Sequence, residues 1–137
     1  MADVLMRPAT LQDMPELVGM AEAFASVAER PLTFDRSRTA GVLASLITSP
    51  DGLVLIAAGG FIAAQVTTTN MSRERIAVEH CWYFRSAVGL ALLRAYEAWA
   101  RERGAKLIRF TSFNERVAAI LRQAGYEPAE QVWAKAA

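Results

Sequence analysis

The fold is decided by residues 89–105, GLALLRAYEAWARERGA. Apolar side chains recur in this segment at helical spacing, and charged residues occupy most of the other positions. The apolar positions are Leu92, Leu93, Tyr96, Trp99 and Ala100. We predict one long helix over residues 89–103, with an i,i+4 ion pair between Glu97 and Arg101 and with Gly104 at the C-terminal cap.

Segments typical of β-strands lie on both sides of this helix. Residues 76–84 and 106–111 are short and rich in apolar and aromatic side chains. A strand, a long helix and a second strand form a βαβ unit, in which the two strands run parallel. The C-terminal half of the sheet is therefore predicted to be parallel.

The preceding part of the chain predicts antiparallel pairing. Strands are expected over residues 53–57 and 61–67, joined by Gly59-Gly60, a pair that suits a tight hairpin turn. A short first strand over residues 4–7, closed by Pro8, comes before them.

Two helices are expected between the first strand and the hairpin. The first begins at Asp13, whose carboxylate can accept from the free amides of the first turn, and the second is capped by Asp35. Their predicted buried stripes are Leu17, Met20, Ala21, Phe24 and Ala25 in the first helix, and Val42, Leu43, Leu46 and Ile47 in the second.

The end of the chain predicts a shorter helix over residues 114–123, stopped by Gly125, and then one or two strands at Tyr126 and residues 131–134. Together the segments predict a single α/β domain over residues 1–137. Its central β-sheet is expected to be mixed, antiparallel in the N-terminal half and parallel in the C-terminal half, with helices flanking it.

The composition argues against several classes of protein. With 137 residues, of which 53% are hydrophobic, the chain can bury the core of one domain. A net charge of +1 argues against a nucleic-acid partner. The apolar stretch over residues 52–64 is interrupted by glycines and is too short to span a membrane. The single cysteine, Cys81, and the absence of a leader-like N-terminus indicate the cytoplasm.

The turn that precedes the long helix is the most informative chemical feature. Residues 85–93 join a strand to a helix through small side chains, so that a ligand can approach the backbone closely. The free amides and the dipole of a helix N-terminus attract phosphate, and Arg85 can add a charge-assisted hydrogen bond. The turn therefore suits a pyrophosphate, although an ordinary connection between a strand and a helix explains it equally well.

The order of the elements and four local strings resemble the GNAT superfamily of acyltransferases. The strings are MRPAT at residues 6–10 followed by Asp13, PDGLVLIA at 50–57, the helix at 89–105, and NE at 114–115 with LRQAGY at 121–126. The likeness covers nearly the whole chain and is closest to small GNAT-like proteins of phages and bacteria.

This resemblance implies an enzyme, an N-acetyltransferase that transfers an acetyl group from acetyl-CoA directly to a primary amine. The co-substrate would be coenzyme A, with no metal, and the acceptor would be an amine of a small molecule or a peptide. A homodimer is common among the proteins that the chain resembles.

The resemblance also implies which residues bind the coenzyme. In this family the fourth and fifth strands splay apart, and the pantetheine arm binds the free backbone of the fourth strand. The implied contacts are Trp82, Tyr83 and Phe84 for pantetheine, Arg85, Ser86, Ala87, Val88, Gly89 and Leu90 for the pyrophosphate, and Asn114 for the coenzyme arm.

The phosphate-binding turn departs from the family pattern. Ala87 replaces the first glycine, and the turn is a few residues short. Phe84 stands where an arginine or glutamine is usual, unless Arg85 slides into that position. Two explanations are open: the loop is trimmed in this protein, or a mobile segment is missing from the sequence at this junction. The alternative function is therefore a non-catalytic binding or assembly protein on the same fold.

Glu79 is the candidate general base. Transfer to an amine requires removal of its proton, and the family often places a carboxylate on the fourth strand. Alternation predicts Glu79, Cys81 and Tyr83 on one face of the strand and His80, Trp82 and Phe84 on the other. Among apolar neighbours the pKa of Glu79 should rise. The alternative is a structural glutamate paired with an arginine.

Other candidates are weaker. His80 is expected to be a packed core residue and Cys81 a small buried residue rather than a nucleophile. Leu121 stands where the family often has a tyrosine acid, so no residue is assigned to protonate the thiolate. Glu29 and Arg30 lie in a linker that would border the acceptor.

Overall fold

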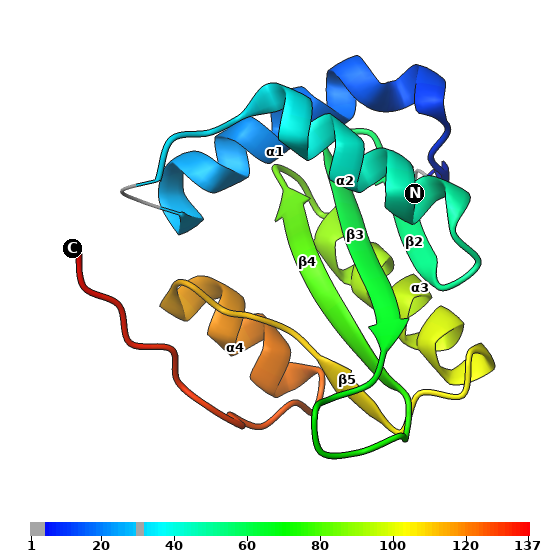
Figure 1. Cartoon of the computed structure of the whole chain (residues 1–137), viewed down its shortest axis with the longest axis vertical. Helices are drawn as coiled ribbons and strands as arrows, with labels where there is room; N and C mark the ends of the chain where they lie inside the picture. Colours follow the sequence, from blue (N-terminus) through cyan, green and yellow to red (C-terminus); the bar gives the residue numbers. More distant parts are fainter. Residues whose placement is uncertain (1–4, 30–31) are drawn as a thin grey trace.

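The computed structural model describes residues 5–29 and 32–137. A five-stranded sheet with the order β1-β2-β3-β4-β5 forms its centre (Figure 1). The strands are β1 (Met6–Pro8), β2 (Gly52–Ala57), β3 (Gly60–Thr67), β4 (Ile76–Phe84) and β5 (Leu107–Arg109). The first four strands pair antiparallel and β4 pairs parallel with β5, which confirms the predicted mixed sheet.

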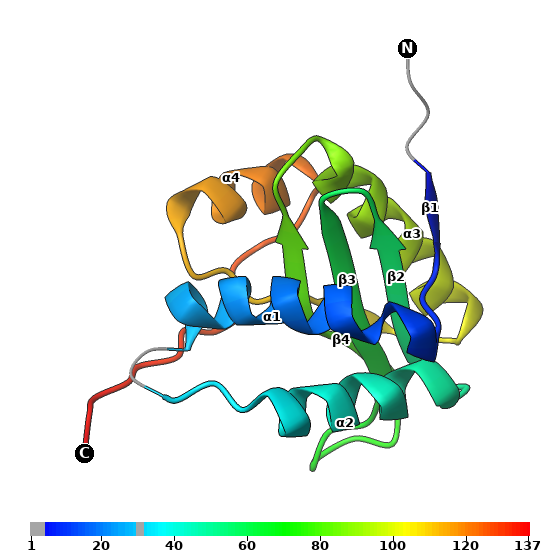
Figure 2. The same cartoon turned by 90° about the horizontal axis from the view of Figure 1, so that it is seen from above.

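Helices cover both faces of the sheet. A 3-10 turn, η1 (Leu11–Asp13), leads into α1 (Met14–Ala28), and α2 (Arg36–Thr48) lies beside α1 on the same face, as Figure 2 shows. On the opposite face α3 (Val88–Glu102) packs against β2, β3 and β4, and α4 (Glu115–Gln123) joins the same apolar cluster as α3. Each expected helix is therefore present.

Alternation along β3 explains why both faces of the sheet are apolar. Ile62, Ala64 and Val66 belong to the cluster under α3, whereas Phe61 and Ala63 belong to the cluster under α1 and α2. Successive side chains of a strand point to opposite faces, so this interior strand must be apolar at nearly every position.

The helix caps agree only in part with expectation. Asp35 caps α2 as predicted, accepting a 2.9 Å hydrogen bond from the backbone amide of Arg38. In the predicted stripe of this helix Leu43 and Leu46 are buried, but Val42 is 47% exposed, so its assignment to the core was wrong. α2 covers the edge of its layer, and a narrower stripe meets the sheet there.

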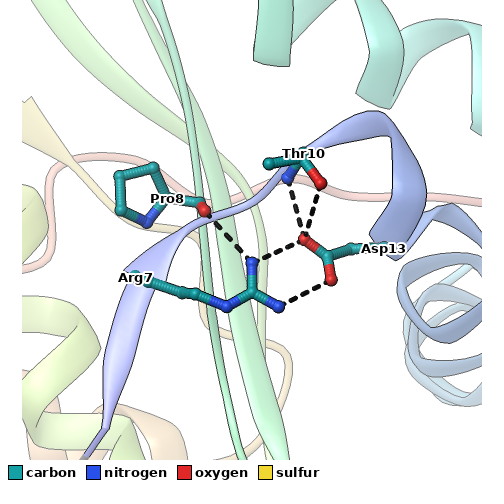
Figure 3. A network of polar contacts seen from close by, with 4 residues as sticks. All are labelled: Arg7, Pro8, Thr10 and Asp13. Atoms are coloured by element: carbon teal, nitrogen blue, oxygen red, sulfur yellow. Dashed lines mark hydrogen bonds and ion pairs between the residues drawn. The ribbon is translucent and has the colours of Figure 1, made fainter.

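Asp13 does not cap α1 as expected. Its carboxylate accepts two hydrogen bonds of 2.7 Å from the guanidinium of Arg7 and one of 2.8 Å from the backbone amide of Thr10 (Figure 3). Arg7 and Thr10 hold the pKa of Asp13 well below its usual range. The network connects β1 to the 3-10 turn that leads into α1. Because this turn occupies Leu11–Asp13, α1 begins only at Met14.

The expected C-terminal strands are wrong: in the described part of the chain no strand follows β5. After α4, Gly125 adopts a φ of +95° and the chain turns, so that the hydroxyl of Tyr126 donates a 2.8 Å hydrogen bond to Glu97. Trp133 beyond it is 85% exposed. A strand needs a partner as well as a suitable sequence, and none of the five described strands pairs with these residues.

Two other expectations concern the ends of elements. Val4, placed in the first expected strand, and Arg30, placed beside the acceptor, lie outside the described residues. Across the ranges 5–29 and 32–137, no helix combines the length and the apolar character needed to cross a membrane.

Candidate active site

β4 and β5 form a fork. They pair only from Ile76 to Val78, opposite Leu107 to Arg109. Past this point β4 continues to Phe84, while the chain after β5 turns away towards α4 (Figure 1). The edge of β4 over residues 79–84 therefore faces a gap in the ladder, as expected for a splayed pair of strands.

Glu79 lies at the point where the fork opens. It is 5% exposed, and its Oε1 accepts a 2.9 Å hydrogen bond from the backbone amide of Thr111. Burial raises the pKa of Glu79 to about 7, although the Thr111 amide acts in the opposite direction. The carboxyl group is therefore poised to exchange a proton near neutral pH.

One oxygen of Glu79 remains available. Within the described residues this carboxylate has a single hydrogen-bond donor, the Thr111 amide. None of the buried side-chain oxygens that the structure describes is both sealed from solvent and without a partner. The second oxygen of Glu79 therefore keeps some contact with solvent, and a water molecule can donate a hydrogen bond to it.

A β-bulge at His80 overturns the predicted alternation of β4. Ala63 pairs with Cys81 and Ala64 pairs with Glu79, so that His80 is the extra residue. Because opposite residues share a face, Glu79 lies with Ala64 on the α3 side of the sheet, and Cys81 lies with Ala63 on the α1 side. Glu79 thus shares the face of Trp82 and not, as expected, that of Cys81 and Tyr83.

The two neighbours of Glu79 are poor candidates for catalysis. His80 is exposed at the bulge, so the expectation of a packed core histidine is wrong. Cys81 is buried as expected, and burial, with the charges of Glu79 and Glu29, raises the pKa of its thiol. A thiol of raised pKa carries little thiolate, so Cys81 is not an activated nucleophile.

A small cavity of about 130 Å³ lies between α1, the end of β4 and the start of α4. We call it the aromatic cleft, and its described lining consists of Ala23, Phe24, Val27, Trp82, Tyr83, Phe84, Phe113, Asn114, Arg116 and Val117. Four of the predicted coenzyme residues therefore meet here: Trp82, Tyr83, Phe84 and Asn114. The side-chain amide of Asn114 also caps α4, because its Oδ1 accepts a 2.9 Å hydrogen bond from the Val117 amide.

The predicted pyrophosphate residues form a separate group. Arg85, Ser86 and Ala87 make an exposed turn, held by a 2.8 Å hydrogen bond from the Arg85 amide to the carbonyl of Gly59. α3 begins after Ala87 with no side-chain cap, and Val88 and Gly89 are buried while Leu90 is half exposed. None of these six residues lines the aromatic cleft.

Phe84 closes one approach to the start of α3. A Cβ added at Gly89 would lie 2.8 Å from the Phe84 ring, so the ring packs directly on the helix backbone. The indole of Trp82 donates a 3.1 Å hydrogen bond to the carbonyl of Gly89. The centroids of the Trp82 and Phe84 rings are 4.9 Å apart. The two side chains together hold the end of β4 against the first turn of α3.

Six lining residues were not among the predicted site residues: Ala23, Phe24, Val27, Phe113, Arg116 and Val117. The Cζ atom of Arg116 lies 5.7 Å from the centroid of the Phe84 ring, and the rings of Phe24 and Phe113 meet edge to face at 5.3 Å. Phe24 had been assigned to the core stripe of α1, and nothing in the local pattern singled out Phe113 or Arg116. Only the convergence of α1 and α4 brings them together.

The polar contacts of α3 also differ from expectation. Glu97 pairs with Arg94 at 3.0 Å, and the predicted pair with Arg101 does not form. Tyr126 turns Glu97 towards α4, since its hydroxyl donates to the other carboxylate oxygen. Leu121, which stands where the resembled family often has a tyrosine acid, is buried in the core. The described residues contain no group of three or more His, Cys, Asp or Glu arranged to hold a metal ion.

Neither a family model nor a curated protein matches this sequence. Solved structures do share its fold along nearly their full length. A transcriptional regulator from Bacillus halodurans is 19% identical, with 98% of this chain and 99% of that chain covered and a TM-score of 0.73. An aminoglycoside 6'-N-acetyltransferase from Acinetobacter haemolyticus is 15% identical, with 97% of each chain covered and a TM-score of 0.72.

A third similar structure carries a coenzyme derivative. AAC(6')-Iy, solved with the bisubstrate analogue CoA-S-monomethyl-acetylneamine, is 14% identical, with 99% of each chain covered and a TM-score of 0.70. At these identities the likeness concerns the fold alone. The proteins that share this fold are described differently, one as a transcriptional regulator and others as acetyltransferases. With its mixed sheet, flanking helices and forked fourth and fifth strands, the chain has the fold of the GNAT acetyltransferases.

Proposed function

We propose that the protein is an acyl-CoA-dependent N-acyltransferase that moves an acetyl group from acetyl-CoA to a primary amine. The observation that carries the proposal is Glu79, a buried carboxyl group with a pKa of about 7 at the opening of a strand fork. A structural glutamate would more commonly be paired with a cation, whereas this one accepts only a backbone amide among the described residues.

The free edge of β4 would hold the coenzyme arm. Beyond Val78 the backbone of β4 has no strand beside it on the β5 side, and an amide-containing arm can add there as a strand would. Trp82, Tyr83 and Phe84 would flank that arm, with Asn114 across the cleft. The amides at the start of α3, next to exposed Arg85, would receive the pyrophosphate.

The proposed chemistry is a direct transfer. Glu79, as carboxylate, takes a proton from the amine, directly or through one water. The amine nitrogen forms a bond to the acetyl carbonyl carbon, the carbon–sulfur bond breaks, and the thiolate leaves with the coenzyme. Solvent supplies the proton for the thiolate, since Leu121 cannot. Backbone amides of β4 at the fork can stabilise the oxyanion.

A non-catalytic binding protein is the second candidate, and the Phe84 ring favours it. The ring lies against Gly89 in the first turn of α3, next to a turn of only Arg85, Ser86 and Ala87. In this position the Phe84 ring leaves less space for a pyrophosphate beside the backbone amides in the first turn of α3.

A titration with coenzyme distinguishes the two candidates. A ligand that binds only the folded state raises the melting temperature as its concentration rises. We expect acetyl-CoA and free CoA to raise it, and an amine panel to release thiol from acetyl-CoA. Stabilisation without thiol release, or no stabilisation at millimolar coenzyme, would reject the acyltransferase and favour the non-catalytic protein.

Oligomeric state and location complete the proposal. We propose a homodimer, on the resemblance alone, and a cytoplasmic location, on the single cysteine. Light scattering after size-exclusion chromatography gives the mass directly, and a monomer at micromolar concentration would contradict the dimer.

A further inference from the structure

The outer wall of the aromatic cleft is apolar. Ala23, Phe24 and Val27 contribute it from α1, and Phe113 contributes it from the segment before α4. Val27 is 60% exposed and Phe113 is 39% exposed, so apolar surface remains uncovered at the mouth. Exposed apolar side chains beside a cavity are typical of a site that binds an apolar ligand.

The charge of the cleft is unsuited to a polycation. Arg116 is the single charged residue among its described lining residues, and its guanidinium lies over the Phe84 ring. Glu79 does not line the cleft, and Glu29 is exposed at the end of α1. A ligand with several ammonium groups would meet a fixed cation and too few carboxylates to balance its charges.

The size of the cleft is a second restriction. Its volume of about 130 Å³ is comparable to that of a cavity of about 150 Å³ that accepts a benzene molecule. If the coenzyme arm lies along β4, the acyl group and the reacting end of the acceptor must share this space. The part of the acceptor inside the cleft is therefore a narrow chain or one ring-sized group, and the rest of the molecule lies at the open mouth.

We propose that the acceptor is a monoamine whose amino group is carried on an apolar or aromatic body, and not an aminoglycoside. The inference rests on the proposed acyltransferase function and names its substrate class. Two of the similar structures are aminoglycoside acetyltransferases or carry an acetylneamine analogue, and aminoglycosides are polycations. The described lining of the aromatic cleft has no carboxylate to balance those charges.

The test compares acceptors by thiol release from acetyl-CoA. The probes are 2-phenylethylamine, n-hexylamine and kanamycin at equal concentrations. We expect kcat/KM for 2-phenylethylamine to exceed that for kanamycin by about tenfold or more, a ratio typical of apolar pockets. Equal or faster turnover of kanamycin would overturn the proposal.

A matched pair of variants locates the effect. Val27→Asp adds a carboxylate at the mouth of the cleft, and Val42→Asp adds one at an exposed position of α2 away from it. We expect Val27→Asp to lower kcat/KM for 2-phenylethylamine about fivefold and to raise it for kanamycin, while Val42→Asp leaves both unchanged. Identical profiles for the two variants would place the acceptor elsewhere and overturn the proposal.

Amine binding is also measured without turnover, so that a failure of the proposed function is distinguishable. Each amine is titrated in a thermal-shift assay with the wild type and with Val27→Asp. Stabilisation by 2-phenylethylamine that weakens in Val27→Asp would support the apolar site even if acetyl-CoA did not bind. Stabilisation by kanamycin alone, or by neither amine, would overturn it.

Discussion

The backbone amide of Thr111 donates a 2.9 Å hydrogen bond to the carboxylate of Glu79 at the point where β4 and β5 stop pairing. Val78 and Arg109 are the last paired residues of the two strands. The side chain of Glu79 thus takes the place of the next backbone partner and holds the fork at a fixed opening. The same carboxyl group is the proposed base, so Glu79 has both a structural role at the fork and a proposed catalytic role.

Glu79→Gln separates these two roles. Glutamine keeps an oxygen that can accept from the Thr111 amide but cannot take a proton from the amine. We expect kcat to fall about 10²–10³-fold, within the usual contribution of a general base. At pH 5, where the Glu79 carboxyl is protonated in the folded wild type, we expect little change in melting temperature. Turnover equal to the wild type, measured by thiol release, would show that Glu79 is structural.

Stability should fall as the pH rises towards neutrality. The pKa of Glu79 is raised from 4.5 to about 7 in the folded protein, so between these values the folded state binds a proton that the unfolded state has lost. The contribution is fully present below pH 4.5 and disappears as the pH passes 7, a change of about 3 kcal/mol in the free energy of unfolding.

Urea unfolding at pH 5, 6, 7 and 8 measures this dependence. Glu79→Gln provides the control, because it has no proton to bind in this window. The difference in unfolding free energy between wild type and variant should change with pH in the stated direction. A difference that stays constant from pH 5 to 8 would contradict the raised pKa.

Two variants of Asn114 distinguish its role as the cap of α4 from its proposed contact with the coenzyme arm. Its Oδ1 caps α4 through the Val117 amide, so Asn114→Ala should destabilise the protein by about 1 kcal/mol. Asn114→Asp retains a capping oxygen and should keep the stability of the wild type. If Asn114 also binds the coenzyme arm through its NH₂ group, both variants should bind acetyl-CoA more weakly in calorimetry. Weakening in the alanine variant alone would reduce its role to the cap.

The ion pair between Arg7 and Asp13 should stabilise the protein at neutral pH and lose its effect in acid. The pKa of Asp13 is held below its usual range, so its contribution is present above the unfolded value and is lost as the pH falls through the folded one. Asp13→Asn should lower the melting temperature by a few degrees at pH 7, and Arg7→Lys should retain part of the effect. Equal melting temperatures at pH 7 would mean that the network of Figure 3 contributes nothing measurable.

Two glycines should respond oppositely to alanine. A Cβ at Gly52 would lie 2.3 Å from the carbonyl oxygen of Leu46, and because this is backbone, Gly52→Ala should cost about 3 kcal/mol. At Gly41, inside α2, a Cβ meets nothing within 4 Å, so Gly41→Ala should stabilise the protein by about 1 kcal/mol. Denaturant unfolding of both variants measures the two signs, and a stable Gly52→Ala protein would show that α2 can shift.

Local sequence determined most of the secondary structure. The helical spacing of Leu92, Tyr96 and Ala100 was enough for α3, and Gly59-Gly60 was enough for the hairpin, because propensity and turn chemistry act over a few residues. The parallel pairing of β4 and β5 also followed, since a long helix between two strands permits little else. The order of the elements then fixed the fold.

The tertiary structure alone decided the geometry of the site. The bulge at His80, which puts Cys81 on the face opposite Glu79, arises from the register of β4 against β3, and strict alternation along a single strand cannot reveal it. The aromatic cleft likewise needs Phe24 and Arg116, which lie far apart in the chain, to converge. The predicted final strands failed for the same reason: strand pairing and pockets depend on partners distant in sequence, whereas helices and turns are stabilised by their own neighbours.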